Sequence, residues 1–265
     1  MDPLIARMRA IAEEAGHRLL SAFSLQARPG SREQVLQAMA VNERLVTQDL
    51  KTSLTALQPA AAWWDDEEGG EAMPDGEWWL VDTVEGNVNH VHGSGEWGVT
   101  ITLVRDRQPV AAVVHQPVEA VTWTAVREGG TRRNGQPVHI GAKARLDAAI
   151  ATTGQAEAGQ THTYAVIGRS VSAMLGQALL VRMAVPTTFQ LLQLAEGRSD
   201  VFWQYEPSWT GIAAGLLMVT EAGGVASRLD GTPWQPGAGD ILLTTPTLHA
   251  AAVATLRGVA IAEAA

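Results

Sequence analysis

Two acidic residues three positions apart follow an apolar run in the segment WWLVDTVEGNVNH, residues 78–90. Gly86 and Asn87 come directly after Glu85 and are typical of a turn that opens a helix. Carboxylates bind hard cations such as Mg²⁺, and the free N–H groups at a helix start favour a phosphate. Asp82 and Glu85, with Gly86 and Asn87, therefore form a candidate metal-assisted phosphate site. The alternative interpretation is that both acids merely cap a helix.

A run of acids precedes this segment, in WWDDEEGGE, residues 63–71. Adjacent carboxylates repel one another and are typical of a solvated surface. The two tryptophans directly before the run indicate that one end of it is tied into a folded layer. One or two of its acids, among them Asp66 and Glu67, can then reach inward as metal ligands.

Histidines and aromatic residues suggest two further sites. His90, His92 and His115 invite a metal-triad interpretation, but His90 and His92 lie in a glycine-containing loop with no matching acidic partner. His90 and His92 are instead candidates for the wall of a binding pocket. A candidate lid over a flat or apolar ligand is formed by three aromatic residues, Trp203, Tyr205 and Trp209.

The composition is typical of a soluble globular protein: of 265 residues, 46% are hydrophobic and 18% are charged, and the formal net charge is −9. This acidic balance argues against nucleic acid as a partner, because no basic stretch offsets it. The absence of cysteine excludes disulfides, thiolate metal sites and a cysteine nucleophile. The N-terminal segment is interrupted by charges, unlike a signal peptide, and no apolar stretch reaches the roughly 18 residues of a membrane span. We expect a cytoplasmic protein without a membrane partner.

The first part of the chain predicts helices followed by an antiparallel sheet. Apolar residues recur at helical spacing after Asp2 and Pro3, and a second helix is expected from Ser31 to about Leu57, with a break near Val46. The predicted strands cover residues 78–81, 97–105, 109–115 and 122–126. Turns are expected at residues 106–108 and 134–135.

The second part predicts alternating strands and helices. The predicted strands cover residues 149–153, 164–167, 200–204 and 241–245, and the predicted helices cover residues 170–180, 187–197, 211–222 and the tail after Thr247. The order of elements predicts a layered α/β protein with two intimate halves, residues 1–145 and 146–265. The first half contains the acidic loop and the DTVEGN motif.

Five segments carry motifs in an order known from one family. Residues 78–104 are similar to W-x-x-D-P-[IL]-D-G-T-x-N-[FY] and the strand that follows it. REGGTRRNGQPVHI, LLQLAEGRSDVFWQ and GIAAGLLMVTEAGGVASRLDGTPW are similar to a G-x-G-A-x-x-N-G hairpin, a helix–G-R-x-D–strand segment and an A-A-G-x-x-[IVL]-x-E-A-G-G signature. LVTQD resembles V-T-x-x-D, one residue short. On these segments the chain resembles the inositol monophosphatase family of Mg²⁺-dependent, Li⁺-sensitive sugar phosphatases.

The resemblance implies a five-layer αβαβα sandwich, a homodimer and Mg²⁺-dependent hydrolysis of a small phosphorylated metabolite. Asp82 stands at the position of the family's bridging metal aspartate. Asp66 or Glu67 aligns with a further metal-binding acid, which would also help to activate the attacking water. Glu85 replaces the family's second aspartate and keeps its charge, so it is a metal ligand by resemblance.

On the substrate side, the resemblance assigns the phosphate to backbone N–H groups of Gly86 and Asn87. Asn87 stands in place of a threonine that orients the attacking water, which makes it a candidate catalytic residue. His90 occupies an aromatic position of the family motif. Gln204 stands where an acid often contacts substrate hydroxyls, and Glu206, close by, is a candidate substrate contact or replacement metal ligand.

The chain departs from the family pattern at the second metal. Counted without gaps from Gly197 and Asp200, the family's W-D pair falls on Thr210 and Gly211, so the third metal carboxylate is absent. The family's small G-S-A run falls on residues 185–187, which are Val, Pro and Thr. Mg²⁺ needs only one or two carboxylates. We therefore expect one Mg²⁺ site and a second site that is weakened or lost.

Three hypotheses follow for the function. The first is a divergent Mg²⁺-dependent phosphomonoesterase in which a metal at Asp82 and an acid of residues 65–68 activate a water. The second is an enzyme of a specialised pathway with other chemistry, in which Asp82, Glu85 and Glu206 act as general acid or base in an aromatic pocket. The third is a non-catalytic protein that binds a ligand or partner through the same cleft.

Overall fold

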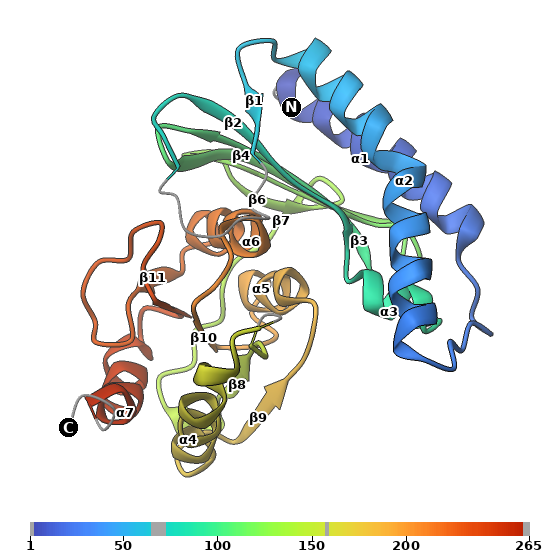
Figure 1. Ribbon diagram of the computed structural model, residues 1–265. Helices are drawn as coiled ribbons and strands as arrows, with labels where there is room; N and C mark the ends of the chain where they lie inside the picture. Colours follow the sequence, from blue (N-terminus) through green and yellow to red (C-terminus); the bar gives the residue numbers. More distant parts are fainter. Residues whose placement is uncertain (1–2, 65–72, 157–158, 262–265) are drawn as a thin grey trace. The chain divides into compact units, whose positions relative to one another are not determined.

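The computed structural model describes residues 3–64, 73–156 and 159–261 (Figure 1). The chain forms two compact units, of which the first ends at Pro137 and the second takes in Met73 and the chain from Val138 onward. Each unit has its own hydrophobic core. The boundary between residues 145 and 146 that we expected from the sequence stays a prediction.

The first unit contains a seven-stranded sheet whose strands lie in chain order. Its strands are β1 (Ala62–Trp63), β2 (Glu77–Glu85), β3 (Gly98–Arg105), β4 (Gln108–Gln116), β5 (Val121–Val126), β6 (Gly130–Arg133) and β7 (Gln136–Pro137). β1 is parallel to β2, and the other neighbouring pairs are antiparallel. Positive φ angles at Asp106, Arg107, Asn134 and Gly135 form two tight turns, which confirms the predicted turns.

Two long helices, α1 (Pro3–Ala22) and α2 (Arg32–Leu57), cover one face of this sheet (Figure 1). The buried residues of α1 recur every three or four positions, which gives the helix one apolar face. Ser31 caps α2, because its hydroxyl accepts a backbone N–H of the first turn. The predicted break near Val46 is wrong, since the buried stripe of α2 continues through Val46 to Leu54.

The second unit contains a five-stranded sheet in the order β11-β12-β10-β8-β9. Its strands are β8 (Ile150–Thr153), β9 (Leu180–Met183), β10 (Val201–Tyr205), β11 (Val225–Ser227) and β12 (Asp240–Thr244). β8 is parallel to β9 and to β10, whereas β12 is antiparallel to β10 and to β11. The parallel pairs require crossover connections, which two helices supply.

Four helices surround this second sheet, together with short 3₁₀ turns at Leu146–Ala148 and Thr161–Thr163. The helices are α4 (Tyr164–Leu175), α5 (Thr187–Ala195), α6 (Trp209–Glu221) and α7 (His249–Ile261). α4 packs beside α7 and α5 beside α6. Val201, Trp203 and Tyr205 share a core with α4 and α7, while α5 contacts β8 and β10. Alternate residues of β10 therefore serve two helical layers.

The strand predicted at residues 164–167 is wrong, because these residues open α4. Val166, Ile167, Ser170 and Met174 form the buried face of that helix, at the spacing of three to four that a helix requires. A short apolar run does not distinguish a strand from a buried helix end, and tertiary packing decides the outcome here. β9 and β11 are two short strands that the sequence did not predict.

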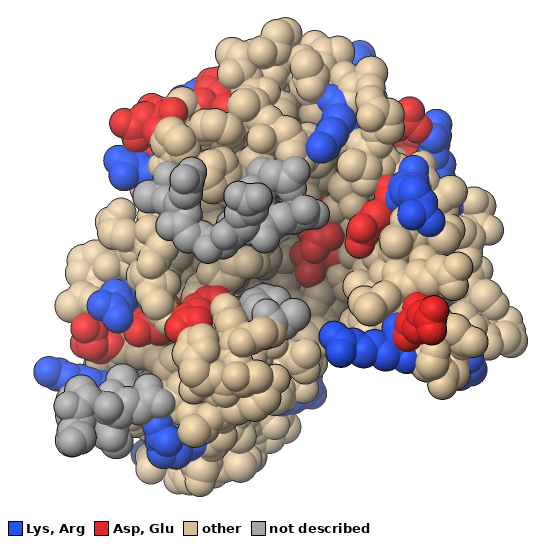
Figure 2. All heavy atoms as spheres, viewed as in Figure 1, with Lys and Arg blue, Asp and Glu red and all other residues tan. Residues whose placement is uncertain are grey.

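Within the described ranges, no helix combines the length and apolarity that crossing a membrane requires. On the face shown in Figure 2, the Lys and Arg side chains of the described residues are scattered among acidic ones and do not gather into one basic surface. This distribution agrees with the acidic composition, and the absence of a nucleic-acid partner stays a prediction.

Candidate functional site

β2 continues through the two acids of the DTVEGN segment, where we expected it to end before them. Asp82 pairs with Thr100 and Glu85 pairs with Gly98, so β2 has one residue more than β3 between these pairs. This extra residue is a β-bulge. In a regular strand, residues three apart point to opposite faces of the sheet.

The bulge restores the two carboxylates to one face. Thr100 and Gly98 are two residues apart and share a face, and directly paired residues also share a face, so Asp82 and Glu85 lie on the same side. The neighbouring Val81 and Val84, again three apart, both join the core under α1 and α2. The two acids therefore occupy the face opposite these helices.

The two carboxylates have different surroundings. Asp82 is half-buried, and its Oδ1 accepts the backbone N–H of Val84 at 3.0 Å, which orders the bulge. The side chain of Glu85 is buried, with 4% of the residue exposed, and Thr100 Oγ1 donates to its Oε2 at 3.5 Å. Two oxygen donors on one face of a strand are the kind of ligand that Mg²⁺ prefers.

α3 (Asn87–Val91) is separated from β2 by one residue, Gly86, which is its N-cap. Gly86 adopts the left-handed conformation, with φ 73° and ψ 34°, which a glycine reaches without strain. The buried side chain of Asn87 faces α2, where Oδ1 accepts from Asn42 Nδ2 at 2.8 Å and Nδ2 donates to Met39 O at 3.1 Å and Glu43 Oε1 at 3.2 Å. The side chain thus anchors α3 to α2, and its predicted role beside an attacking water stays a prediction.

His90 is buried and bonded through both ring nitrogens, and the predicted substrate contact stays a prediction. The residue is 3% exposed, and its Nδ1 lies 2.9 Å from Asn42 Nδ2 while its Nε2 lies 3.1 Å from Leu19 O. An amide N–H and a carbonyl fix the tautomer: Nδ1 accepts and Nε2 donates. Burial lowers the pKa of His90, partly offset by the bond to Leu19 O. Both ring nitrogens are therefore engaged inside the first unit.

Asn42 joins these contacts and was missed from the sequence. Its carboxamide donates to Asn87 and to His90, and it is only 5% exposed. The available signal was a polar residue at a core position, four residues before Val46 in the buried stripe of α2. The network it forms ties α1, α2 and α3 together directly after the acid-bearing bulge.

In the second unit, the junction between β10 and α6 carries the remaining predicted residues. Gln204 is buried, and its Oε1 accepts from Thr187 Oγ1 at 3.3 Å. Glu206 has a positive φ of 43°, and its two carboxylate oxygens lie 2.8 and 3.0 Å from His162 Nε2. Gly211 donates its N–H to Ser208 Oγ at 3.2 Å, the cap of α6.

Asp66 and Glu67, predicted as metal ligands and catalytic acids, lie outside the described residues. Within the ranges that the structure describes, no three His, Asp or Glu side chains form a group that could hold a metal. Asp82 and Glu85 are thus the pair of predicted metal ligands that the described structure brings to one face.

The chain has close relatives among known proteins. An inositol-1-monophosphatase of Rhizobium meliloti is 31% identical over 206 residues, which are 76% of this chain and 74% of that protein. A Nus factor SuhB of Pseudomonas aeruginosa is 32% identical over 174 residues, 63% of each protein.

Solved structures show the same architecture. An inositol monophosphatase from Anabaena superposes with a TM-score of 0.80 at 20% identity, covering 96% of this chain and 94% of that one. The extragenic suppressor protein SuhB of Bartonella henselae gives 0.79 at 22% identity, covering 97% and 99%. These matches confirm the predicted fold class, a layered α/β sandwich of this type. The sequence model of the inositol monophosphatase family matches residues 1–260, and this chain therefore belongs to that family.

Proposed function

We propose that this protein is a divergent metal-dependent phosphomonoesterase that hydrolyses a small phosphorylated metabolite. Membership of the inositol monophosphatase family supports a phosphatase-like function. The observation that carries the proposal is the bulge of β2, which brings Asp82 and Glu85 to one face of the sheet.

Asp82 and Glu85 would hold a hard cation such as Mg²⁺. Two carboxylates, one of them partly exposed, suit this ion, which usually keeps several waters and needs one or two protein carboxylates. When bound, the ion would polarise a phosphate oxygen and make a water molecule more acidic. Asp66 or Glu67 would contribute the remaining acid and take the proton of the attacking water.

The phosphate would be bound by the backbone N–H groups of Gly86 and Asn87. This role does not need the Asn87 side chain, which is engaged with α2. The predicted contact of Gln204 with the substrate stays a prediction. His90 is left out of the proposed site because its ring nitrogens are engaged.

The site would work with one strong metal position. The family's third carboxylate corresponds to Gly211. Glu206 is a poor replacement, since its carboxylate is already engaged by His162. The homodimer and the cytoplasmic location stay predictions.

The loss at Gly211 favours one second candidate, a member that binds a ligand or a partner without hydrolysis. Some relatives carry the name Nus factor SuhB rather than that of a phosphatase. This candidate keeps the fold and the phosphate contacts but needs no metal.

The test is phosphate release from a panel of inositol, sugar and nucleoside monophosphates, with Mg²⁺ or with EDTA. Asp82→Asn should lower Mg²⁺-dependent release by about 100-fold or more, because a metal ligand loses its charge. Asp75→Asn is the matched control, since Asp75 is 73% exposed and pairs with Arg107. A folded protein that releases no phosphate would favour the second candidate, and equal release in EDTA would reject a metal-dependent reaction.

A second test restores the absent acid. Gly211→Asp should raise Mn²⁺ or Mg²⁺ affinity and turnover, whereas Gly211→Asn, of the same shape, should not. A Cβ at residue 211 would lie 2.7 Å from Ser208 Oγ, so both variants shift the same cap. Calorimetric metal titration separates the effect of charge from the effect of shape, and equal behaviour of the two variants would reject a simple lost-ligand account.

A further inference from the structure

A hollow of about 520 Å³ lies within the first unit, between α1 and the hairpin of β5 and β6. Its volume falls inside the range of roughly 300–1,000 Å³ that is common for small-molecule sites. The residues that line it are Ile5, Arg9, Thr122, Thr124, Ala125, Val126, Gly129, Gly130, Arg132 and Gly135. Among these described residues, two are arginines and none is acidic.

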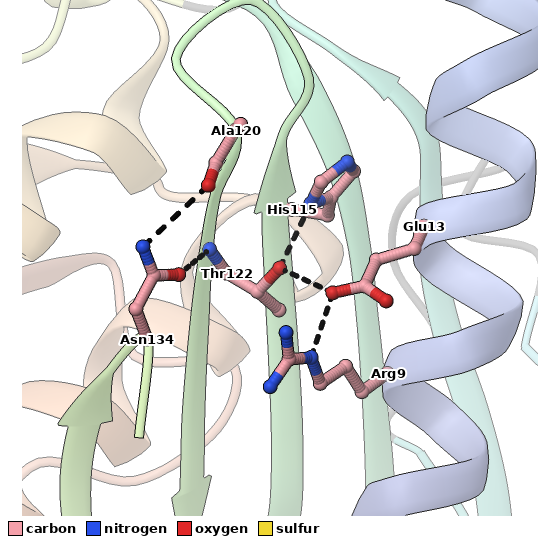
Figure 3. A network of polar contacts seen from close by, with 6 residues as sticks. All are labelled: Arg9, Glu13, His115, Ala120, Thr122 and Asn134. Atoms are coloured by element: carbon pink, nitrogen blue, oxygen red, sulfur yellow. Dashed lines mark hydrogen bonds and ion pairs between the residues drawn. The ribbon is translucent and has the colours of Figure 1, made fainter. Parts of the chain in front are cut away.

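Arg9 is held in place by a polar chain that Figure 3 shows. Its Nε donates to Glu13 Oε1 at 2.6 Å, and Thr122 Oγ1 donates to the same oxygen at 2.9 Å. His115 Nδ1 lies 2.9 Å from Thr122 Oγ1 and must donate to it, because the hydroxyl hydrogen is directed at Glu13. Asn134 Oδ1 accepts the backbone N–H of Thr122 at 2.8 Å, which fixes the strand.

These hydrogen bonds leave the two terminal nitrogens of the Arg9 guanidinium available to a ligand. The terminal nitrogens of Arg9 make no hydrogen bond to any residue that the structure describes. Burial acts to raise the pKa of Glu13, but the hydrogen bonds from Arg9 and Thr122 outweigh it, so the pKa is lowered and the carboxylate stays charged. Glu13 therefore orients Arg9, and the two terminal nitrogens of the Arg9 guanidinium remain available as hydrogen-bond donors.

Arg132 supplies the second guanidinium. It is paired with Thr124 across β5 and β6, so both side chains lie on the face that Thr122 and α1 share. Its Nη1 donates to Gly135 O at 3.2 Å, and within the described ranges it has no carboxylate at ion-pair distance. Since Glu13 balances Arg9, one positive charge of the hollow is uncompensated.

We propose that this hollow binds a small organic oxyanion, a carboxylate or a phosphate ester, between Arg9 and Arg132. Guanidinium groups match both anions through paired N–H donors. The threonine hydroxyls add polar contacts, while Ile5 and Val126 offer apolar surface to an organic body. The hollow exceeds a bare inorganic ion in volume, so a ligand with a carbon framework fits the lining better.

This site is independent of the acids on β2, because α1 lies on the opposite face of the sheet from Asp82 and Glu85. The inference does not rest on phosphatase activity. Binding can be measured in EDTA, where a site that depends on a metal ion does not bind its ligand.

The experiment is calorimetric titration in EDTA with three probes of similar shape: benzoate, phenylphosphonate and neutral benzamide. We expect saturable binding of at least one anion and none of benzamide, and the preferred anion identifies a carboxylate or a phosphate site. Arg132→Gln, at an exposed side chain, should weaken the bound anion by about tenfold, the loss of one charge-assisted contact.

Arg127→Gln is the matched control, because Arg127 lies on the same hairpin, is exposed and bonds Gln108 rather than the hollow. Thr124→Val, of equal shape, should weaken binding by a smaller factor. The proposal is overturned if neither anion binds at millimolar concentration, if benzamide binds as well as the anions, or if Arg132→Gln binds like Arg127→Gln.

Discussion

Two strand-to-helix junctions of this protein, β2–α3 and β10–α6, solve the same local problem in different ways. At the first junction a single left-handed residue, Gly86, connects strand and helix, and the acids stay on the strand. At the second, three residues intervene, Glu206 takes the left-handed conformation, and Ser208 caps the helix with its own hydroxyl.

The difference lies in what the polar side chains contact. At β2–α3, Asn87 and His90 are engaged by Asn42, while the two acids share the opposite face of the sheet. At β10–α6, the one acid is engaged by His162, and Gly211 at the helix start donates its N–H to the capping Ser208. A cation site is consequently expected at the first junction, and a self-contained helix start at the second.

The largest expected effect concerns the network behind β2–α3. Asn42→Ala leaves Asn87 Oδ1 and His90 Nδ1 without their buried donor, and we expect the free energy of unfolding to fall by about 3 kcal/mol. Urea denaturation measures it. Gln37→Ala, at an exposed amide of the same helix, should change stability by less than about 0.5 kcal/mol. Equal losses in the two variants would mean that the network adds no stability to this junction.

At β10–α6 the cap is the expected weak point. Ser208→Ala removes the acceptor for Gly211 N, and the free energy of unfolding should fall by about 1 kcal/mol. Ser53→Ala, at an exposed serine inside α2, is the control and should stay within about 0.5 kcal/mol. If the two substitutions are equivalent, the hydroxyl of Ser208 is not what stabilises the start of α6.

A double-mutant cycle sharpens the same point. Gly211→Ala should gain up to about 1 kcal/mol from reduced backbone freedom, but its Cβ would lie 2.7 Å from Ser208 Oγ. The gain should therefore be larger in the Ser208→Ala background, with a coupling of about 0.5 kcal/mol or more. Strict additivity would show that the Ser208 hydroxyl moves away from the new Cβ without any cost in free energy.

The smallest effect is a pH dependence at β2–α3. Burial lowers the pKa of His90 in the folded protein below the value of 6.5 expected for the unfolded chain. At a pH between the folded and unfolded pKa, the ring is protonated in the unfolded chain and neutral in the folded protein. Stability is complete above about pH 6.5 and declines as the pH falls toward the lowered folded value. NMR titration of the ring measures the folded pKa directly. A value at or above 6.5 would contradict the burial of a neutral ring.

Much of this arrangement could be predicted from the sequence. The apolar periodicity of α1 and α2 and the turn residues Asn134–Gly135 predict local structure through short-range rules. The family motifs predict the fold as a whole. The loss of a metal ligand at Gly211, which rests on a change of residue type at a motif position, stays a prediction.

The features that could not be predicted depend on contacts between distant segments. The sequence around Asn87 does not indicate that its amide contacts α2, where its partner Asn42 lies 45 residues earlier in the chain. His90 was expected to be a pocket residue from its place in the family motif, and its bond to Leu19 O, which spans 71 residues, could not be predicted from the sequence. Residues 164–167 carry a pattern that suits either a strand or a helix, and their packing selects the helix.

The bulge in β2 has a consequence for how this segment tolerates change. Side-chain direction along a strand has a period of two, so the additional residue between Asp82 and Glu85 would by itself put the acids out of phase, and the bulge that accommodates it puts them in phase again. The information for the site is then held in segment length as well as in residue identity. A regular strand over the same residues would separate the acids onto two faces although neither is altered, so an alignment that scores only residue types would miss the loss.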